Sequence, residues 1–413
     1  MRFLYLYPDV HIWYDNHQLL FFDTRSQIQK VFAINRLNKK LAEQLSDVDN
    51  LYCVEISSDN NDSSLISIII DNNFGRVFDC DWEDRLVAIP PYHILEQSYN
   101  RNGDFFYLQV LNLIKTVTLH VGGDCQTRCS SCSELFKQMT FCTKEGQIFS
   151  DSSLNNLRFK LNGLNKLERL NIILSSPDRQ VIESAEQLMR DGVLNCFFIS
   201  WKIVSEPIIK QITSSPFPLL VKILIDFTEI TESQLSQFFR LQQTYKDSLV
   251  LVFCIKSESD LIRIKSKQRN EDLANCEIRC AYTGGSKKHL NQCYLLNDSD
   301  LLSLTANHNR IFQNRELNSD LFGQIVIHPD GSVRLNENTE IIGTVDDNWT
   351  EMLNKALNKP NPWLMTRKQT EPCSNCIYQD LCPPIRNLEL YMGDKLACVD
   401  FYKSRLRPSD ENN

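Results

Sequence analysis

Three cysteines that directly follow a short apolar run constrain this chain more than any other feature of its sequence. The run is TVTLHV, and after Gly122 and Gly123 come Cys125, Cys129 and Cys132, with the spacing C-x3-C-x2-C. Thiolates are soft ligands that suit zinc or iron–sulfur clusters. Three thiolates leave a tetrahedral zinc ion one ligand short, but they hold a four-iron cluster by three irons. The spacing therefore favours a [4Fe–4S] cluster whose fourth iron is open to a small molecule.

The chain has 15 cysteines in 413 residues and no export signal. Its start, MRFLYLYPDVHIWYD, lacks a basic region leading into an apolar core, and no stretch is apolar enough to span a membrane. We therefore expect a cytoplasmic protein with no membrane partner, whose clustered cysteines bind metal or act in catalysis rather than form disulfides. The net charge of −8 is mild and no basic run stands out, so we expect no nucleic-acid partner.

A second cysteine set lies near the C-terminus. Its members have the spacing C-x2-C-x5-C-x15-C and are Cys373, Cys376, Cys382 and Cys398. Four thiolates satisfy either zinc or a [4Fe–4S] cluster, and spacing alone favours zinc because such sites are common. Most of the other cysteines lie in apolar runs such as NCFFIS, where a free cysteine behaves as a small buried hydrophobe.

From Val117 onward, buried strands alternate with helices. The strand candidates are TVTLHV, RLNIIL, NCFFIS, LLVKILIDF, SLVLVFCI and CEIRCAYT. Helical segments such as QVIESAEQLMRDG lie between them, which is typical of a βα repeat with a parallel sheet. Six repeats are too few for a closed eight-stranded barrel. We therefore expect an α/β fold with a partial (β/α)6 barrel over residues 113–305, and an active site in the loops after the strands.

The flanking regions predict smaller units. Residues 1–85 start with aromatic strands in a meander, followed by the helix NRLNKKLAEQLSD, the strand LYCVEI and the helix SSLISIII, which together suggest a small α+β, winged-helix-like domain. A linker with two adjacent prolines covers residues 86–112. Residues 306–405 combine a hairpin around a PDG turn, the helix NWTEMLNKALN and the second cysteine set, and residues 406–413 form a disordered tail.

The layout resembles a known superfamily. The stretches YLYPDVHIWY, CSSCSELFKQMTFCT and PCSNCIYQDLCPPIRNLE are similar to peptide-modifying members of the radical S-adenosylmethionine superfamily that carry a SPASM-type C-terminal domain. The match is closest to a Bacteroidales-type group that includes pseudo-radical-SAM proteins, and it runs over most of the chain. The resemblance implies a radical-SAM-type barrel, a peptide-recognition-like N-terminal domain and a SPASM-like iron–sulfur domain.

The resemblance also implies cofactors and partners. Cys125, Cys129 and Cys132 would hold the [4Fe–4S] cluster, S-adenosylmethionine would chelate its open iron, and reductive cleavage would produce a radical that abstracts hydrogen from a ribosomal precursor peptide. The C-terminal set would hold an auxiliary [4Fe–4S] cluster, so the chain would carry one or two clusters. The leader of the peptide would add to a strand edge of the N-terminal domain. A reductase or a second maturase would be a further partner.

Three positions bear on catalysis. Ser131 stands where the family has an aromatic residue before the third cysteine. Ser175, Ser176, Pro177 and Asp178 follow RLNIIL, where the family has a glycine-rich turn that binds the amino group of S-adenosylmethionine. Cys142 gives a hypothesis: as a fourth ligand it would close the cluster, and Cys142→Ala would impair cluster assembly. The alternative is that Cys142 is a buried spectator beside Phe141.

Three functions remain open from the sequence. The first is a radical S-adenosylmethionine peptide maturase, and the second is a degenerate member that binds the precursor peptide and assists a catalytic partner. The third, a zinc-stabilised structural protein, leaves the first cysteine set without a purpose. We expect His120 to be a packed core residue and the YTGG stretch at Tyr282 to be a tight turn.

Overall fold

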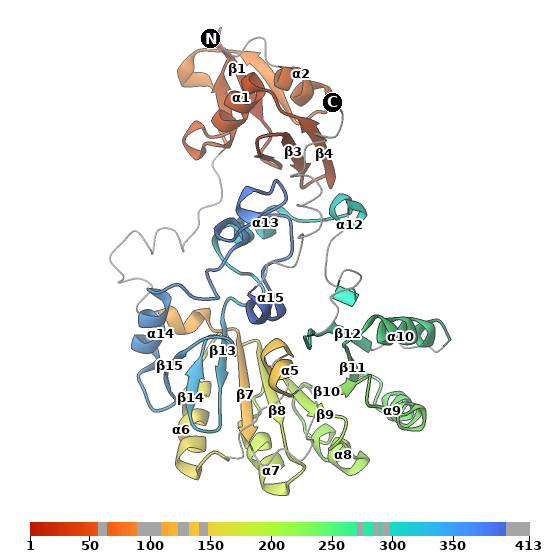
Figure 1. Cartoon of the computed structure of the whole chain (residues 1–413). Helices are drawn as coiled ribbons and strands as arrows, with labels where there is room; N and C mark the ends of the chain where they lie inside the picture. The colour runs from red at the N-terminus through yellow and green to blue at the C-terminus, as the bar shows by residue number, and fades with distance from the viewer. Residues whose placement is uncertain are drawn as a thin grey trace.

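The computed structural model describes residues 1–56, 64–88, 109–122, 132–139, 148–270, 276–284, 289–290 and 298–393. Two parts stand out: a large sheet with its helices, and a smaller N-terminal unit (Figure 1). Among the described residues, no helix combines the length and the apolar character that crossing a membrane requires.

The large sheet has nine strands in the order β12-β11-β10-β9-β8-β7-β13-β14-β15. Six consecutive strands run parallel to one another: β7 (Thr116–Gly122), β8 (Arg169–Leu174), β9 (Leu194–Ser200), β10 (Leu219–Asp226), β11 (Leu249–Ile255) and β12 (Cys276–Cys280). They coincide with the six predicted strands, so the predicted α/β class and the parallel βα repeat are confirmed.

Helices between these strands cover one face of the sheet. They are α6 (Asp151–Asn162), α7 (Arg179–Leu188), α8 (Glu206–Thr213), α9 (Glu232–Thr244) and α10 (Glu258–Asn270). Alternation along β7 directs Val117, Leu119 and Val121 into the main core, which also contains Leu154 and Leu157 of α6. The polar or ionisable residues between them, such as His120, therefore face the other side of the sheet.

A short helix, α5 (Cys132–Met139), lies on that other face, in contact with α15 (Asn387–Met392). Leu135 and Met139 of α5 pack with Ile173, Phe198 and Cys254 of the strands in a second, smaller core. This face of the sheet is therefore partly covered from within the chain, by a helix that directly follows the predicted cluster-binding loop.

The predicted hairpin is confirmed and has an additional role. It consists of β13 (Gln324–Ile327) and β14 (Ser332–Arg334), and β15 (Ile341–Thr344) pairs antiparallel to β14. Because β13 also pairs in parallel with β7, the hairpin extends the sheet on the side opposite to β8. The predicted helix that follows is α14 (Trp349–Leu357).

The N-terminal unit corrects one prediction. Its first three strands do not form one meander, because β1 (Arg2–Leu6) pairs with β5 (Cys53–Glu55) and β6 (Gly75–Asp79) instead of β2. Leu4 and Leu6 point into the core of the unit, while Phe3 stacks on Phe78 and contacts the tilted ring of Trp82. Strand β1 is therefore buried on both faces and takes a central position in its sheet. A second sheet contains β2 (Val10–Tyr14), β3 (Gln18–Asp23) and β4 (Ile28–Ala33).

The predicted helices of this unit are confirmed as α1 (Arg36–Ser46) and α2 (Ser64–Asp71). Asn35 caps α1, since its side chain accepts a hydrogen bond from the backbone of Asn38 at 2.8 Å. The strands β4 and β6 were not predicted.

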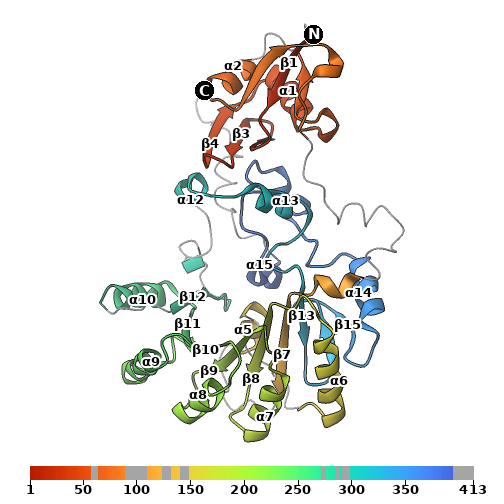
Figure 2. The ribbon, with the colours of Figure 1, turned by 180° about the vertical axis from the view of Figure 1, so that it is seen from behind.

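The second N-terminal sheet also packs against the C-terminal cysteine loop. Leu19 and Phe21 of β3 face the core of their own unit. The alternate residues Leu20 and Phe22 join a core with Ile377, Leu381 and other residues near the cysteines. The run LLFF is continuous because β3 is buried on both faces. Figures 1 and 2 both show the unit beside α12 (Asp298–Leu302) and α13 (His308–Glu316) and away from the large sheet.

Candidate functional site

Three cysteines of the C-terminal set lie in one compact loop. Cys373 and Cys382 are buried, and Cys376 is half-buried. The backbone N–H groups of Cys376 and Cys382 bond to the carbonyl oxygens of Cys373 (3.0 Å) and Tyr378 (2.9 Å), and the N–H of Tyr378 donates to the sulfur of Cys376 at 3.4 Å. Cys398, the fourth predicted ligand, lies outside the described residues.

A buried arginine contacts this loop. Nη1 of Arg367 lies 3.6 Å from the sulfur of Cys373, and the guanidinium pairs with Glu389 at 3.2 and 3.1 Å. Burial opposes the charge, yet the Glu389 carboxylate and the sulfurs of Cys373 and Cys382 raise the pKa of Arg367. Sulfur binds metal as thiolate, so a positive charge beside this loop would partly offset the negative charge of metal-bound thiolates. The soft donors and this charge fit zinc or an iron–sulfur cluster equally. Sequence reasoning missed Arg367, whose only signal is its place six positions before Cys373.

The first cysteine set falls mostly outside the described part of the chain. Cys125, Cys129 and Cys142 lie outside it, as does Ser131, and of Cys132 only its place as the first residue of α5 is described. The described elements on either side are β7, which ends at Gly122, and α5. The set therefore connects the first of the six consecutive parallel strands to the helix on the inner face of the sheet.

The turn after β8 is closed by internal hydrogen bonds. Ser175 Oγ donates to the carbonyl oxygen of Gly122 at 2.5 Å, which ties the end of β8 to the end of β7. Ser176 is fully buried, and its hydroxyl donates to Oδ2 of Asp178 at 2.6 Å while accepting from the backbone N–H of Asp178 at 3.2 Å. The two hydroxyls and the carboxylate are thus engaged with the protein itself.

Helix α5 is fixed at its C-terminal end. The amide of Gln138 bonds twice to the backbone of Tyr282, from Nε2 to the carbonyl oxygen at 2.7 Å and from the N–H to Oε1 at 2.8 Å. Asn338 Nδ2 donates to the carbonyl oxygen of Lys137 at 3.0 Å. In the predicted YTGG turn, Gly284 has φ +85°, which suits a tight turn, and Gly285 lies outside the described residues. The segments after β12 and β14 therefore both hold α5 over the sheet.

His120 is a packed core residue, as predicted, but it also takes part in a polar group. Its Nε2 lies 2.5 Å from Oε1 of Glu337, and Nε2 of His328 lies 3.1 Å from Oε2 of the same carboxylate. The two imidazole rings stack with their centroids 4.6 Å apart and their planes 4° from parallel. Neither His328 nor Glu337 was identified from the sequence, although His328 directly precedes the PDG turn and Glu337 directly follows the predicted hairpin.

The charge of Glu337 follows from this arrangement. Burial alone would raise the pKa of the carboxyl, but the hydrogen bonds and charges of His120 and His328 outweigh it and lower the pKa to about 2. Glu337 is therefore ionised at neutral pH. Among the described residues, His120, His328 and Glu337 form the one group of three potential metal ligands whose ligand atoms all lie within 4.8 Å of one another.

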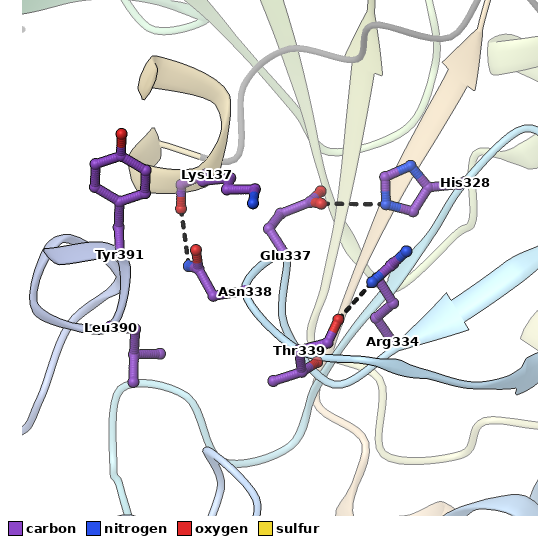
Figure 3. A pocket seen from close by; sticks show the side chains of 8 residues that line it. All are labelled: Lys137, His328, Arg334, Glu337, Asn338, Thr339, Leu390 and Tyr391. Carbon is purple, nitrogen blue, oxygen red and sulfur yellow. Dashed lines mark hydrogen bonds and ion pairs between the residues drawn. The ribbon is translucent and has the colours of Figure 1, made fainter. Parts of the chain in front are cut away.

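Two cavities lie near these residues. One, of about 470 Å³, is bordered by His328 and Glu337, with Lys137 of α5 opposite them (Figure 3). The other, of about 740 Å³, lies on the inner face of the sheet. Its cationic lining residues are Arg169, Lys222, Lys265, Arg279 and Arg386. Glu277 pairs with Lys222 and Arg279, and Asp320 pairs with Arg386, so positive charge remains in excess and suits an anionic group.

The chain matches no protein-family model and no curated protein. Among solved structures, native anSMEcpe with bound AdoMet is similar at 14% identity and a TM-score of 0.47, over 70% of this chain and 94% of that one. A hexahistidine-tagged form of anSMEcpe with bound AdoMet is similar at 15% identity and a TM-score of 0.46, over 71% and 91%. Native anSMEcpe with bound AdoMet and Cp18Cys peptide has 14% identity and a TM-score of 0.44, over 70% and 94%. Likenesses of this strength do not establish a shared activity.

Proposed function

We propose that this protein is a radical S-adenosylmethionine-type maturase that modifies a ribosomally synthesised precursor peptide in the cytoplasm. The observation that carries the proposal is the position of the C-x3-C-x2-C stretch, directly after β7 at the carboxyl edge of six consecutive parallel strands. Ligands of parallel α/β folds bind at that edge, where the loops after the strands meet.

In this proposal the two cysteine sets have separate roles. Cys125, Cys129 and Cys132 hold a [4Fe–4S] cluster with an open iron for S-adenosylmethionine, and Cys373, Cys376, Cys382 and Cys398 hold an auxiliary cluster. When bound, these groups supply the radical and electron-transfer chemistry. The chain itself binds and orients the peptide. The positive charge of Arg367 lies beside the sulfur of Cys373 and would partly offset the negative charge of metal-bound thiolates.

The peptide would bind first to the N-terminal unit, which we assign to residues 1–85. In its second sheet, β4 lies at the edge of the order β2-β3-β4 and is largely exposed. An extended leader peptide can add to such an edge through main-chain hydrogen bonds. One face of this sheet packs on the C-terminal loop, so a leader peptide added to β4 would lie close to the auxiliary site. The cationic cavity on the inner face of the large sheet offers a place for a carboxylate of the modified segment.

A second candidate function rests on the turn after β8. If the hydroxyls of Ser175 and Ser176 stay bonded to Gly122 and Asp178, neither donates its proton or its place to a contact with the amino group of S-adenosylmethionine. The protein would then be a degenerate pseudo-radical-SAM protein that binds the precursor peptide and assists a catalytic partner. The packing of α5 on the inner face of the sheet favours the same candidate, because it occupies space that a cofactor and a substrate would need.

One experiment separates the two candidates. The full chain is reconstituted anaerobically with iron and sulfide, its iron is counted, and the reduced protein is measured by electron paramagnetic resonance with and without S-adenosylmethionine. Two clusters, one of whose signals shifts with S-adenosylmethionine, support the maturase. Clusters that ignore S-adenosylmethionine, or zinc in place of iron, support the peptide-binding candidate. The same measurement on Cys142→Ala tests a fourth ligand, since unchanged iron and spectrum would exclude it.

A further inference from the structure

The buried group of His120, His328 and Glu337 has the composition of a metal site. The three residues come from different parts of the sheet: His120 is in β7, His328 directly follows β13, and Glu337 follows β14. All three are buried, with exposed fractions of 0%, 7% and 5%. Carboxylates are almost never buried this deeply unless they are paired or bind a metal.

An ion pair alone explains this group poorly. A single carboxylate faces two stacked imidazoles, and two imidazolium ions with ring centroids 4.6 Å apart would repel each other. The Nε2 atoms of both rings instead converge on one carboxylate, as two imidazole ligands of a single ion do. Nδ1 of His120, on the other side of its ring, is buried and has no hydrogen-bond partner within the described part of the chain.

We propose that His120, His328 and Glu337 bind a divalent transition-metal ion, of the zinc or ferrous class, through the two Nε2 atoms and the carboxylate. Two neutral imidazoles and one carboxylate are the three-ligand set of many catalytic zinc sites and of non-haem iron sites. The ligand atoms already lie within 4.8 Å of one another, so small rotations of the side chains bring them to bonding distance.

A metal ion bound by these three residues would keep open coordination positions that face the cavity. His328 and Glu337 border the 470 Å³ cavity, and Figure 3 shows the Lys137 side chain extending toward Glu337, whose carboxylate points toward His328. Arg334 lines the same cavity, and its guanidinium donates to the carbonyl oxygen of Thr339 at 2.5 Å. Two cationic side chains around the open positions favour water, hydroxide or a carboxylate as the further ligand of the metal. The inference is independent of the proposed function, because no cysteine takes part.

Cobalt(II) distinguishes this site from the thiolate sites. The full chain is stripped of metal anaerobically and titrated with Co²⁺, because sulfur ligation gives charge-transfer absorption that imidazole and carboxylate ligation do not. We expect one equivalent of Co²⁺ without sulfur bands in the wild type. In His328→Asn and Glu337→Gln the apparent affinity for that equivalent should fall at least about 100-fold. Changing a residue that only contacts a metal ligand already lowers metal affinity by up to about 100-fold, and these variants change the ligands themselves.

The matched control is His308→Asn, since His308 contacts another imidazole, that of His11, without a carboxylate between them. It should bind Co²⁺ as the wild type does. Glu337→Gln keeps the size of the side chain, and its metal-free thermal unfolding checks that the variant is folded. The proposal is overturned if both variants bind Co²⁺ with unchanged affinity, or if every equivalent in the wild type shows sulfur bands. Either result would leave the group as a buried ion pair only.

Discussion

The indole N–H of Trp13 donates to Oδ2 of Asp380 at 2.6 Å, although the two residues are 367 positions apart in the sequence. Arg315 donates to the same oxygen at 2.7 Å, and its guanidinium carbon lies 5.6 Å from the centre of the Trp13 ring. Asp380 is two residues before Cys382, in the loop of the C-terminal cysteines. A hydrogen bond therefore connects strand β2 of the N-terminal unit directly to the candidate metal-binding loop.

The Trp13–Asp380 bond should stabilise the docked N-terminal unit measurably. Trp13→Phe removes a hydrogen bond to a carboxylate that is only 3% exposed. Such bonds contribute roughly 1.5–3 kcal/mol, so we expect the free energy of unfolding to fall by about 2 kcal/mol in denaturant titrations. Trp82→Phe is the matched control, because Trp82 is 49% exposed and should change the value by less than about 0.5 kcal/mol. Equal losses in the two variants would argue against a stabilising role of the bond.

The same contact region should weaken in mild acid because of His11. Its Nε2 lies 3.0 Å from Nδ1 of His308, and burial, followed by the charges of Arg315 and His308, lowers the pKa of His11 to about 2. The pKa of His308 is also lowered, by burial and Arg315, against the opposing effect of Asp9. Below pH 6.5 the unfolded chain binds a proton at His11 that the folded chain does not. The stability present above that pH is therefore lost as the pH falls toward 2.

Unfolding free energies at pH 7.5 and pH 5 test this effect. A histidine that stays neutral in the folded state lowers the free energy of unfolding by about 1.4 kcal/mol for each pH unit below its unfolded pKa. At pH 5, His11 should therefore lower the free energy of unfolding of the wild type by about 2 kcal/mol. His11→Gln should remove that part of the pH dependence. His17→Gln, at an exposed histidine of the same unit, should keep the dependence of the wild type. If His11→Gln retains the full difference between the two pH values, His11 is not the group that titrates.

The sequence predicted the large sheet better than the N-terminal unit, for a physical reason. Five of the six parallel strands are largely buried apolar runs next to helices, so local composition identifies them, and β12 is the half-buried exception. Strand order in the N-terminal unit depends on partners far apart in the sequence, since β1 pairs with β6 about 70 positions later. The same is true at one point of the large sheet, where β13 pairs with β7 across some 200 positions. Composition does not encode which strand meets which.

The candidate sites divide in the same way. The cysteine sets were visible because their members are close in sequence, whereas His120 and Glu337 meet across 217 positions and have no shared motif. Arg367 was missed because a buried arginine looks like any surface arginine until its partner Glu389 is placed beside it. Side chains that act through long-range contacts could only be found from the structure.

Removing the charge of only one partner of the Arg367–Glu389 pair should lower the free energy of unfolding strongly. The two side chains are 4% and 0% exposed, so Glu389→Gln leaves a buried guanidinium without its counter-charge. Breaking a buried pair in this way costs roughly 3–5 kcal/mol, while replacing both partners by apolar residues is often neutral. We expect that loss for Glu389→Gln in denaturant titrations and a substantial recovery in Arg367→Met/Glu389→Leu. Glu168→Gln, in an exposed pair with Lys115, should have no measurable effect. An equally small effect of Glu389→Gln would show that the pair contributes little.

Metal content should depend on Cys382 and not on cysteines elsewhere. Cys382 is buried in the loop that Arg367 contacts, and a serine hydroxyl there is a much weaker ligand than a thiolate. After anaerobic reconstitution, Cys382→Ser should lose the metal of the C-terminal site and keep that of the N-terminal set, as measured by elemental analysis. Cys80→Ser is the control, because this half-buried cysteine belongs to neither set and should retain wild-type metal content.

If the charge of Arg367 stabilises metal-bound thiolates, Arg367→Met should weaken metal retention in a chelator challenge even though it removes no ligand. Full retention of metal in Cys382→Ser would mean that Cys382 is not a metal ligand.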